Sequence, residues 1–157
     1  MEYLLGIDIG GTHVKGGIVT GTTGKMDQRT IVYEKIDAGG SATSIIKGIL
    51  RVITALKKGR SENEWRGIGI AIPGPFDYTR GIAAIHGVRK FDALFGLDLK
   101  EEIKGVCSLP VVFLNDASAY ALGEYYGGAA QGSERSMVVT VGTGLGSTFM
   151  SLEDILD

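Results

Sequence analysis

The feature that most constrains the fold is a strand, a glycine turn and a second strand, a pattern that occurs near both ends of the chain. Near the amino terminus, Tyr3–Ile9 and Val14–Val19 are short runs of strand-forming residues on either side of Gly10-Gly11-Thr12. Toward the carboxyl terminus, two more strand-like runs flank Gly142–Gly146. This spacing predicts two β-hairpins whose glycine turns leave backbone amides open to a ligand.

The segments between these hairpins alternate strands and helices. Arg29–Ile36 extends the first hairpin to an antiparallel meander, and the apolar stripe of Ser41–Lys58 predicts a helix with Ser41 as N-cap and Gly59 as its stop. The remaining expected elements are strands at 67–72, near 82–85 and at 111–114, and helices at 97–104 and 117–126. We therefore expect an α/β domain whose mixed sheet opens with the meander and carries helices on its faces.

Composition limits the class of protein. A chain of 157 residues that is 44% hydrophobic can bury one core, so we expect a single domain, 1–157. A net charge of -2 does not favour nucleic acid as a partner. The single cysteine, Cys107, indicates a reducing compartment, and we expect a cytoplasmic protein. No signal peptide is expected, and no apolar run approaches the roughly 20 residues that a membrane span needs.

Asp8 and Lys15 flank the first glycine turn. The amides of Gly10, Gly11 and Thr12 can surround phosphate oxygens, although a plain hairpin connection explains the glycines equally well. Asp8 lies inside an apolar strand, where a carboxylate is costly to bury unless it binds a cation such as the hydrated Mg²⁺ of a nucleotide. Lys15 can neutralise a phosphate, or it is an ordinary solvated lysine.

Asp116 follows a buried-type strand, at the place where open α/β sheets bind their ligands. A carboxylate there can serve as a general base toward a hydroxyl that attacks phosphorus, and Asn115 can hydrogen-bond a second hydroxyl. Asp116 also suits a helix N-cap, and the two roles are compatible. We therefore keep both interpretations for this residue.

The second glycine run, 140–147, suits close approach of the backbone to a second phosphate group. It lacks the lysine of a P-loop, and it precedes an expected strand rather than a helix. Neither the P-loop nor the dinucleotide fingerprint therefore fits. A different nucleotide-binding fold is needed.

Taken together, these segments resemble the ROK family (repressor, open reading frame, kinase) within the actin-like, ribonuclease-H-like ATPase superfamily. The resemblance rests on four motifs in the family's order: Gly6–Thr12 with Lys15, Ile72–Pro75, Leu114–Ala117 with Gly123-Glu124, and Val141–Ser147. It covers essentially the whole chain. It implies a ribonuclease-H-like domain and a glucokinase- or fructokinase-like transfer of phosphate from ATP to a hydroxyl of a hexose or amino sugar.

The resemblance also assigns roles to individual residues. It implies Asp116 as the catalytic base, and it places Asn115, Gly74 and Pro75 beside the sugar. Asp8 is implied near Mg²⁺ through water, with ATP and Mg²⁺ as the cofactors. The residues implied around the ATP phosphates are Gly10, Gly11, Thr12, Lys15, Gly142, Thr143 and Gly144.

The chain departs from the family pattern in three ways. A ROK kinase continues into a second domain, so we expect this chain to be an amino-terminal half that is weakly active or inactive alone. We also expect it to form a homodimer or to associate through the face left by that domain. The family's zinc motif has no counterpart, so no metal other than Mg²⁺ is expected. The first motif begins near residue 6, with no helix-turn-helix ahead of it, which argues against a repressor.

Three alternatives stay open. The first is a non-catalytic, sugar-sensing regulatory protein of the same fold. The second is another member of the actin-like superfamily, an acetate-kinase-like or activator ATPase with a non-sugar substrate. The third concerns the phosphoryl donor, because the sequence does not separate ATP from polyphosphate.

Overall fold

The computed structural model describes residues 2–141 and 145–151. The chain forms two compact units, Met1–Leu114 and Asn115–Asp157, and each is described by itself. Both combine helices with strands, as expected of an α/β protein. The expectation of one domain for the whole chain stays a prediction.

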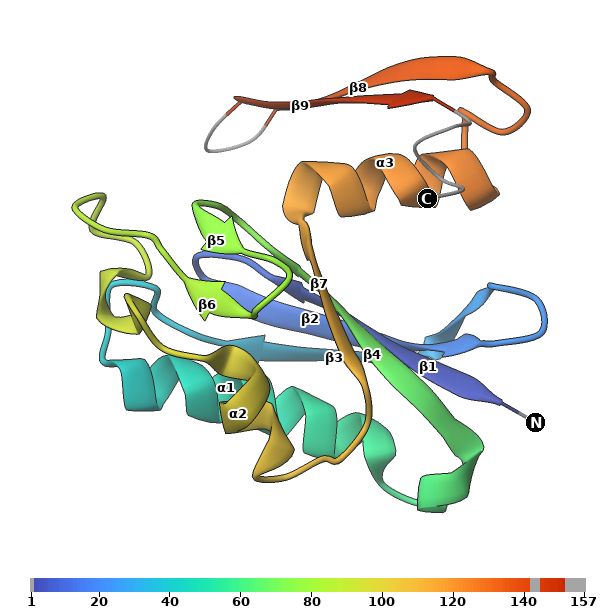
Figure 1. Ribbon diagram of the computed structural model, residues 1–157. Coiled ribbons are helices and arrows are strands. Elements are labelled where there is room, and N and C mark those ends of the chain that lie inside the picture. The colour runs from blue at the N-terminus through green and yellow to red at the C-terminus, as the bar shows by residue number, and fades with distance from the viewer. Residues whose placement is uncertain (1, 142–144, 152–157) are drawn as a thin grey trace. The chain divides into compact units, whose positions relative to one another are not determined.

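The first unit is built on a five-stranded sheet with the strand order β3-β2-β1-β4-β7 (Figure 1). Its strands are β1 (Tyr3–Ile9), β2 (His13–Thr20), β3 (Met26–Lys35), β4 (Trp65–Ile72) and β7 (Val111–Asn115). β2 is antiparallel to both β1 and β3, whereas β1 is parallel to β4. The mixed sheet and its opening meander are thus confirmed, with a third strand that begins earlier than expected.

Helix α1 (Ala42–Lys57) covers one face of this sheet and packs against β1, β2 and β3 (Figure 1). Ser41 is its N-cap, with its side chain accepting a hydrogen bond from the Ser44 amide at 3.3 Å. Gly59 follows the helix with a φ of 83°, a backbone conformation that favours glycine. The expected start and stop of this helix are confirmed. Its buried apolar side chains are Ile45, Ile46, Ile49, Val52, Ile53 and Leu56.

Between β4 and β7 the chain forms short elements. They are the hairpin of β5 (Phe76–Asp77) and β6 (Ile82–Ala83), the 3₁₀ turn η2 (Asp92–Leu94) and helix α2 (Leu99–Lys104). A further 3₁₀ turn, η1 (Glu62–Glu64), precedes β4. The strand expected near 82–85 ends at Ala83. The next residue, Ala84, donates its amide to the carbonyl of Pro75 at 3.1 Å, but proline has no N–H with which to complete the pair. Helix α2 begins later than the expected residue 97, because Asp98 caps it by accepting from the amides of Lys100 and Glu101.

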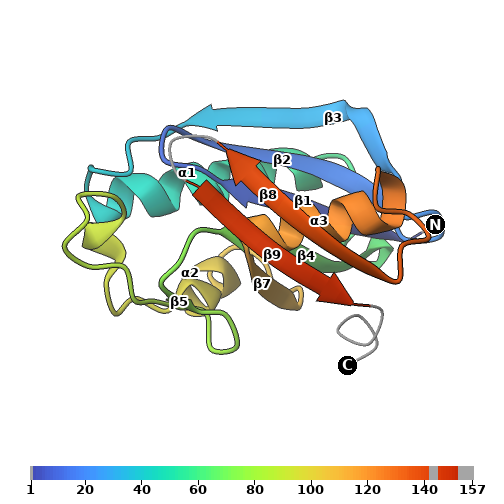
Figure 2. The same cartoon turned by 90° about the horizontal axis from the view of Figure 1, so that it is seen from above.

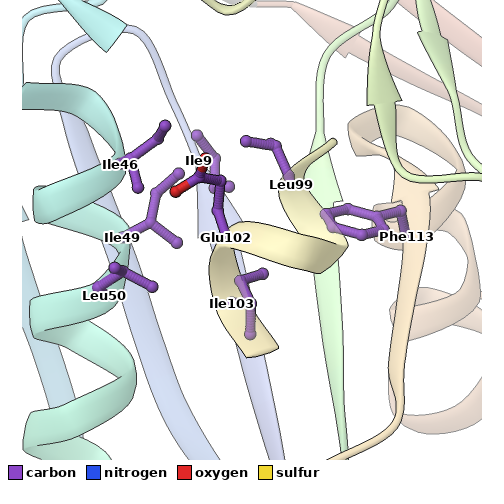
Figure 3. Close-up of a pocket in the computed structure, with 8 residues that line it drawn as sticks. All are labelled: Ile9, Ile46, Ile49, Leu50, Leu99, Glu102, Ile103 and Phe113. Carbon is purple, nitrogen blue, oxygen red and sulfur yellow. The ribbon is translucent and has the colours of Figure 1, made fainter. Parts of the chain in front are cut away.

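A small cavity lies between α1, β1, α2 and β7, and Figure 3 shows the side chains around it. It is lined by seven apolar side chains and by Glu102. Its volume of about 10 Å³ is at the lower limit for a single water molecule, and its walls offer few polar partners. We therefore regard it as a gap in core packing rather than as a ligand site.

The second unit contains helix α3 (Asp116–Gly127) and the antiparallel hairpin of β8 (Arg135–Val141) and β9 (Leu145–Ser151). Figure 2 shows the two strands side by side. Both strands are longer than expected, but the second hairpin itself is confirmed. Across the ranges that the structure describes, none of the helices is long and apolar enough to cross a membrane.

Candidate functional site

The first glycine turn connects β1 to β2, and its backbone is only partly engaged. The amide of Gly10 donates to the carbonyl of His13 at 3.0 Å, and the carbonyl of Gly11 accepts from the amide of Ala38, also at 3.0 Å. The amides of Gly11 and Thr12 have no hydrogen-bond acceptor among the described residues. Two neighbouring amides are therefore available to an anion, as the phosphate hypothesis requires.

Asp8 and Lys15 face each other across the β1–β2 ladder next to this turn. Residues directly opposite in an antiparallel pair point to the same face of the sheet. Asp8 is exposed, whereas its neighbours Ile7 and Ile9 are 4% and 1% exposed and face the core. The carboxylate therefore avoids the cost of burial that an apolar strand would impose, because the alternation of the strand turns Asp8 away from α1.

Lys15 also contacts the third strand. Its ammonium lies 5.5 Å from the ring centroid of Tyr33, which is the residue opposite Lys15 on β3. Lys15 is half-buried and Tyr33 is exposed, and a cation–π contact of this kind contributes little energy. Asp8, Lys15 and Tyr33 thus lie in one row across the meander, on the face opposite α1.

The glycine turn and the proline loop lie at the same edge of the sheet. β1 and β4 are parallel, and Asp8 is paired with Ala71 on β4. Gly10 to Thr12 follow the end of β1, and Pro73-Gly74-Pro75 follow the end of β4. Ligands of open α/β sheets bind outside the carboxyl ends of the strands, so the first unit brings its two sequence motifs to a suitable edge.

The loop at 73–75 is braced on both sides. The hydroxyl of Tyr78 donates to the carbonyl of Ile72 at 3.2 Å, and the carbonyl of Pro75 accepts from the amide of Ala84 at 3.1 Å. The Gly74–Pro75 peptide bond is cis. The two hydrogen bonds hold the loop at both of its ends, while the sugar-binding role of Gly74 and Pro75 stays a prediction.

In the second unit, Asn115 rather than Asp116 caps helix α3. The Asn115 Oδ1 atom accepts from the amides of Ala117 and Ser118 at 3.0 and 3.4 Å. Asp116 is the first residue of the helix, and its Oδ1 accepts from the amide of Ala117 at 2.9 Å. The N-cap interpretation of Asp116 is therefore wrong. Its carboxylate is exposed, and its Oδ2 accepts no hydrogen bond within the described part of the chain.

The strands around the second glycine run pack on the first turn of α3. Thr140 and Gly146 face each other in the β8–β9 ladder, and a Cβ on Gly146 would lie 3.3 Å from the Cβ of Ala117. The hydroxyls of Ser118 and Thr148 are 3.3 Å apart. The predicted phosphate ligands Gly142, Thr143 and Gly144 lie outside the described residues.

One residue at the first turn is absent from the sequence-based set. A Cβ built on Gly11 would lie 2.8 Å from the Cε of Lys90 and 3.4 Å from its Nζ. Lys90 comes from a loop far along the chain, and no spacing rule connects it to the glycines. The only sequence signal is the basic pair Arg89-Lys90, which is common on loops.

The first unit suits Mg²⁺ held by a nucleotide better than a metal held by protein alone. Within residues 2–141 and 145–151, no group of three or more His, Cys, Asp or Glu side chains is placed to hold a metal ion. Mg²⁺ accepts one or two carboxylates together with waters and phosphate oxygens. The single exposed carboxylate of Asp8, next to the two unengaged amides, fits that requirement.

Known proteins resemble the chain in sequence and in structure. The ROK family model matches residues 4–155. A glucokinase from Halalkalibacterium halodurans is 31% identical over 99% of this chain and 46% of its own length. The xylose repressor of Bacillus subtilis is 31% identical over 92% of this chain and 36% of its own length.

A solved structure is similar as well. The crystal structure of a ROK family glucokinase from Streptomyces griseus in complex with glucose and AMPPNP matches 95% of this chain and 44% of its own, with a TM-score of 0.77 and 30% identity. The fold is thus that of the actin-like ATPases. The chain spans less than half of the length of each of these three proteins.

Proposed function

Because the chain belongs to the ROK family, we propose that it is the phosphate- and sugar-binding half of a kinase that transfers the γ-phosphoryl group of ATP to a hexose or amino sugar. Its relatives include glucokinases, but the chain spans only part of them. The activity is therefore proposed for the whole natural protein. We expect that protein to be cytoplasmic.

One observation carries this proposal. The first glycine turn leaves the amides of Gly11 and Thr12 without acceptors, and Asp8 and Lys15 face each other beside it. Amides and a lysine ammonium are donors for phosphate oxygens, while the Asp8 carboxylate is suited to the hydrated cation that accompanies them. A plain hairpin connection needs none of these groups.

Asp116 is proposed as the general base. Its Oδ2 accepts the proton of the sugar hydroxyl as that oxygen attacks the γ-phosphorus, the bond from the γ-phosphorus to the bridging oxygen breaks and ADP leaves. The Oδ1 atom of Asp116 keeps the hydrogen bond from the amide of Ala117. Asn115 and the 73–75 loop would orient the sugar. Thr12 and Lys15 would hold the phosphates, together with Gly142 to Gly144 of the second glycine run. When bound, Mg²⁺ would neutralise charge on the phosphate oxygens.

A second candidate is a non-catalytic regulatory protein that senses a sugar. The likeness to a xylose repressor favours it, since that relative has the same 31% identity as the glucokinase, over 92% of this chain. A sensor needs sugar contacts but has no use for a general base. Asp116 and the Asp8–Lys15 pair therefore favour the kinase.

The test is sugar-dependent release of ADP by the natural full-length protein with a panel of hexoses and amino sugars. Parallel assays should replace ATP with inorganic polyphosphate, and should compare the wild type with Asp116→Asn. Release that depends on one sugar and is lost in the variant supports the kinase. Sugar binding without release from either donor would support the sensor instead.

A further inference from the structure

Lys90 brings a second cation to the first glycine turn. The place where a side chain at position 11 would begin is occupied by the end of the Lys90 side chain, with Cε at 2.8 Å and Nζ at 3.4 Å from a Cβ built on Gly11. Only glycine at this position allows so close an approach. The ammonium therefore lies next to the turn whose Gly11 and Thr12 amides are unengaged.

Backbone hydrogen bonds connect the Lys90 segment to the turn. The amide of Ala38 donates to the carbonyl of Gly11 at 3.0 Å, and the amide of Phe91 donates to the carbonyl of Ala38 at 2.7 Å. The Phe91 side chain is fully buried. The backbone at Lys90 is thus held near Gly11 by the core packing of Phe91 and by these backbone hydrogen bonds.

The residues on both sides of Lys90 have an uncommon backbone conformation. Arg89 and Phe91 have φ values of 58° and 63°, and they are the non-glycine residues with positive φ in the described part of the chain. The carboxylate of Asp92 stabilises the turn by accepting from the amides of Val88 and Arg89 at 3.2 and 3.1 Å. Such conformations persist where the surroundings impose them, so the direction of Lys90 is set by the fold.

Within residues 2–141 and 145–151, the charge of Lys90 is not neutralised by an ion pair. The Asp92 oxygens are bonded to backbone amides, and Oδ1 of Asp37 accepts from the amide of Gly39 at 2.9 Å. Among the described residues, Lys90 forms no ion pair, and its ammonium lies 5.7 Å from the Phe91 ring centroid. A cation held in this way beside two free amides is suited to an anion.

We propose that Lys90 is a ligand of the phosphoryl oxygens at the Gly11–Thr12 turn, acting with the two amides and with Lys15. The inference rests on the proposed function, because it names a further ligand of the same phosphate site. The chemistry is that of a terminal phosphoryl group on a polyphosphate chain, which either a nucleoside triphosphate or inorganic polyphosphate supplies.

The experiment is a titration of the ¹⁵N-labelled 157-residue chain, followed by the amide resonance of Gly11. The probes are the magnesium complexes of AMPPNP and of inorganic tripolyphosphate, which separate the two sources because only AMPPNP contains adenosine. Lys90→Gln keeps the length of the side chain and removes its charge. Lys90→Arg keeps the charge, and Lys25→Ala removes an exposed lysine at the opposite end of β2.

One of the two probes will bind wild type more tightly. For that probe we expect Lys90→Gln to raise the Kd about tenfold, because one charge-assisted hydrogen bond is lost. Lys90→Arg should keep most of the affinity, and Lys25→Ala should change it by less than about twofold, a distant exposed charge being largely screened. Thermal unfolding should be unchanged in all three, since both lysines are exposed.

Equal affinities of wild type and Lys90→Gln, with a clear Gly11 shift in both, would overturn the role of Lys90 and leave the proposed function standing. No Gly11 shift in wild type with either probe would overturn both. If Lys25→Ala lost as much affinity for the probe as Lys90→Gln, the inference would also be contradicted, since the result would show only an effect of net charge.

Discussion

Asp8 and Lys15 point to the same face of the sheet from neighbouring antiparallel strands, with the Ile9–Val14 pair between them and the glycine turn. Ile9 and Val14 point the other way and are almost fully buried, at 1% and 0% exposed. Burial of Ile9 and Val14 thus fixes the pairing of β1 with β2. This pairing places the Asp8 carboxylate and the Lys15 ammonium beside the glycine turn. This arrangement separates the residues that stabilise the hairpin from those proposed to function there.

Asp8→Asn tests that separation. A cross-strand pair of opposite charges contributes about 0.2–1 kcal/mol, so the free energy of unfolding should fall by less than about 1 kcal/mol. Phosphoryl transfer by the full-length protein should fall by about a hundredfold or more, because the cation loses its carboxylate. Asp27→Asn is the matched control, since Asp27 is paired with Arg29 on β3. An Asp8→Asn protein with normal turnover at ordinary Mg²⁺ concentrations would contradict the assignment.

Two glycine substitutions should separate packing from ligand binding. At Gly16 on β2, a Cβ would lie 2.6 Å from Cγ1 of Val52 and 2.8 Å from Cδ1 of Leu56, both buried in α1. Gly16→Ala should therefore destabilise the protein by about 1–3 kcal/mol. Gly11→Ala meets only the flexible end of Lys90, so it should leave stability within about 0.5 kcal/mol while weakening phosphate binding.

Urea denaturation followed by circular dichroism measures both changes. The same preparations are then titrated with magnesium tripolyphosphate. Equal losses of stability at the two positions would show that the Lys90 end is not free to move. Undiminished phosphate binding by Gly11→Ala would count against the role of the turn.

Much of the fold could be predicted from local patterns. The apolar stripe and the Ser41 cap of α1, and the alternation of β1, depend on neighbours in sequence, and the structure confirms them. The exposure of Asp8 could not be predicted, because a strand with one acid among apolar residues does not reveal which of its faces is covered. The cap of α3 was assigned one residue too late for a similar reason, since Asn115 and Asp116 are both good caps.

The candidate site was less predictable than the fold. The glycine turn and the proline loop are visible as motifs, but their common edge depends on the parallel pairing of β1 with β4, which is a long-range contact. Lys90 reaches Gly11 only through the bonds of the 36–40 and 87–92 loops. No periodicity in the sequence encodes such a contact, so only the structure could identify this residue.

The outer face of the second hairpin predicts self-association. Met137 and Phe149 are opposite each other in the β8–β9 ladder and are 56% and 77% exposed, with Val139 on the same side. Contiguous exposed apolar side chains favour association. Sedimentation velocity of this chain should show a concentration-dependent dimer or larger species, and Phe149→Lys should shift it toward monomer. Val88→Lys, at an exposed loop residue of the first unit, is the control. A clean monomer at every concentration would contradict this expectation.

Lys57 should give the chain an alkaline limit of stability. Burial lowers the pKa of its ammonium, but hydrogen bonds to Glu62 at 2.7 Å and to the Cys107 sulfur at 3.2 Å prevail and raise that pKa. When the pKa of a lysine is higher in the folded than in the unfolded state, its ammonium stabilises the folded protein fully at pH values below the unfolded-state pKa. This contribution is lost as the pH rises through the folded-state pKa. The free energy of unfolding should therefore decline above about pH 10.4.

Lys57→Met is the comparison for this prediction. It keeps the length of the side chain and removes the titrating group, so its stability should be lower than that of wild type at neutral pH. The difference in the free energy of unfolding between the two proteins should narrow in strongly alkaline solution, where Lys57 of the wild type loses its proton. Urea denaturation at pH 8 and at pH 11 measures it, and a constant gap between the two proteins would contradict the account.

The central claim is that phosphate passes from ATP to a sugar with Asp116 as the base. Its most direct test follows the label of γ-³²P-ATP in the natural full-length protein, with separation of sugar phosphate from inorganic phosphate. The account predicts label on the sugar in wild type and almost none with Asp116→Asn. Label that appears only in inorganic phosphate, or sugar phosphate that forms equally in the variant, would contradict it.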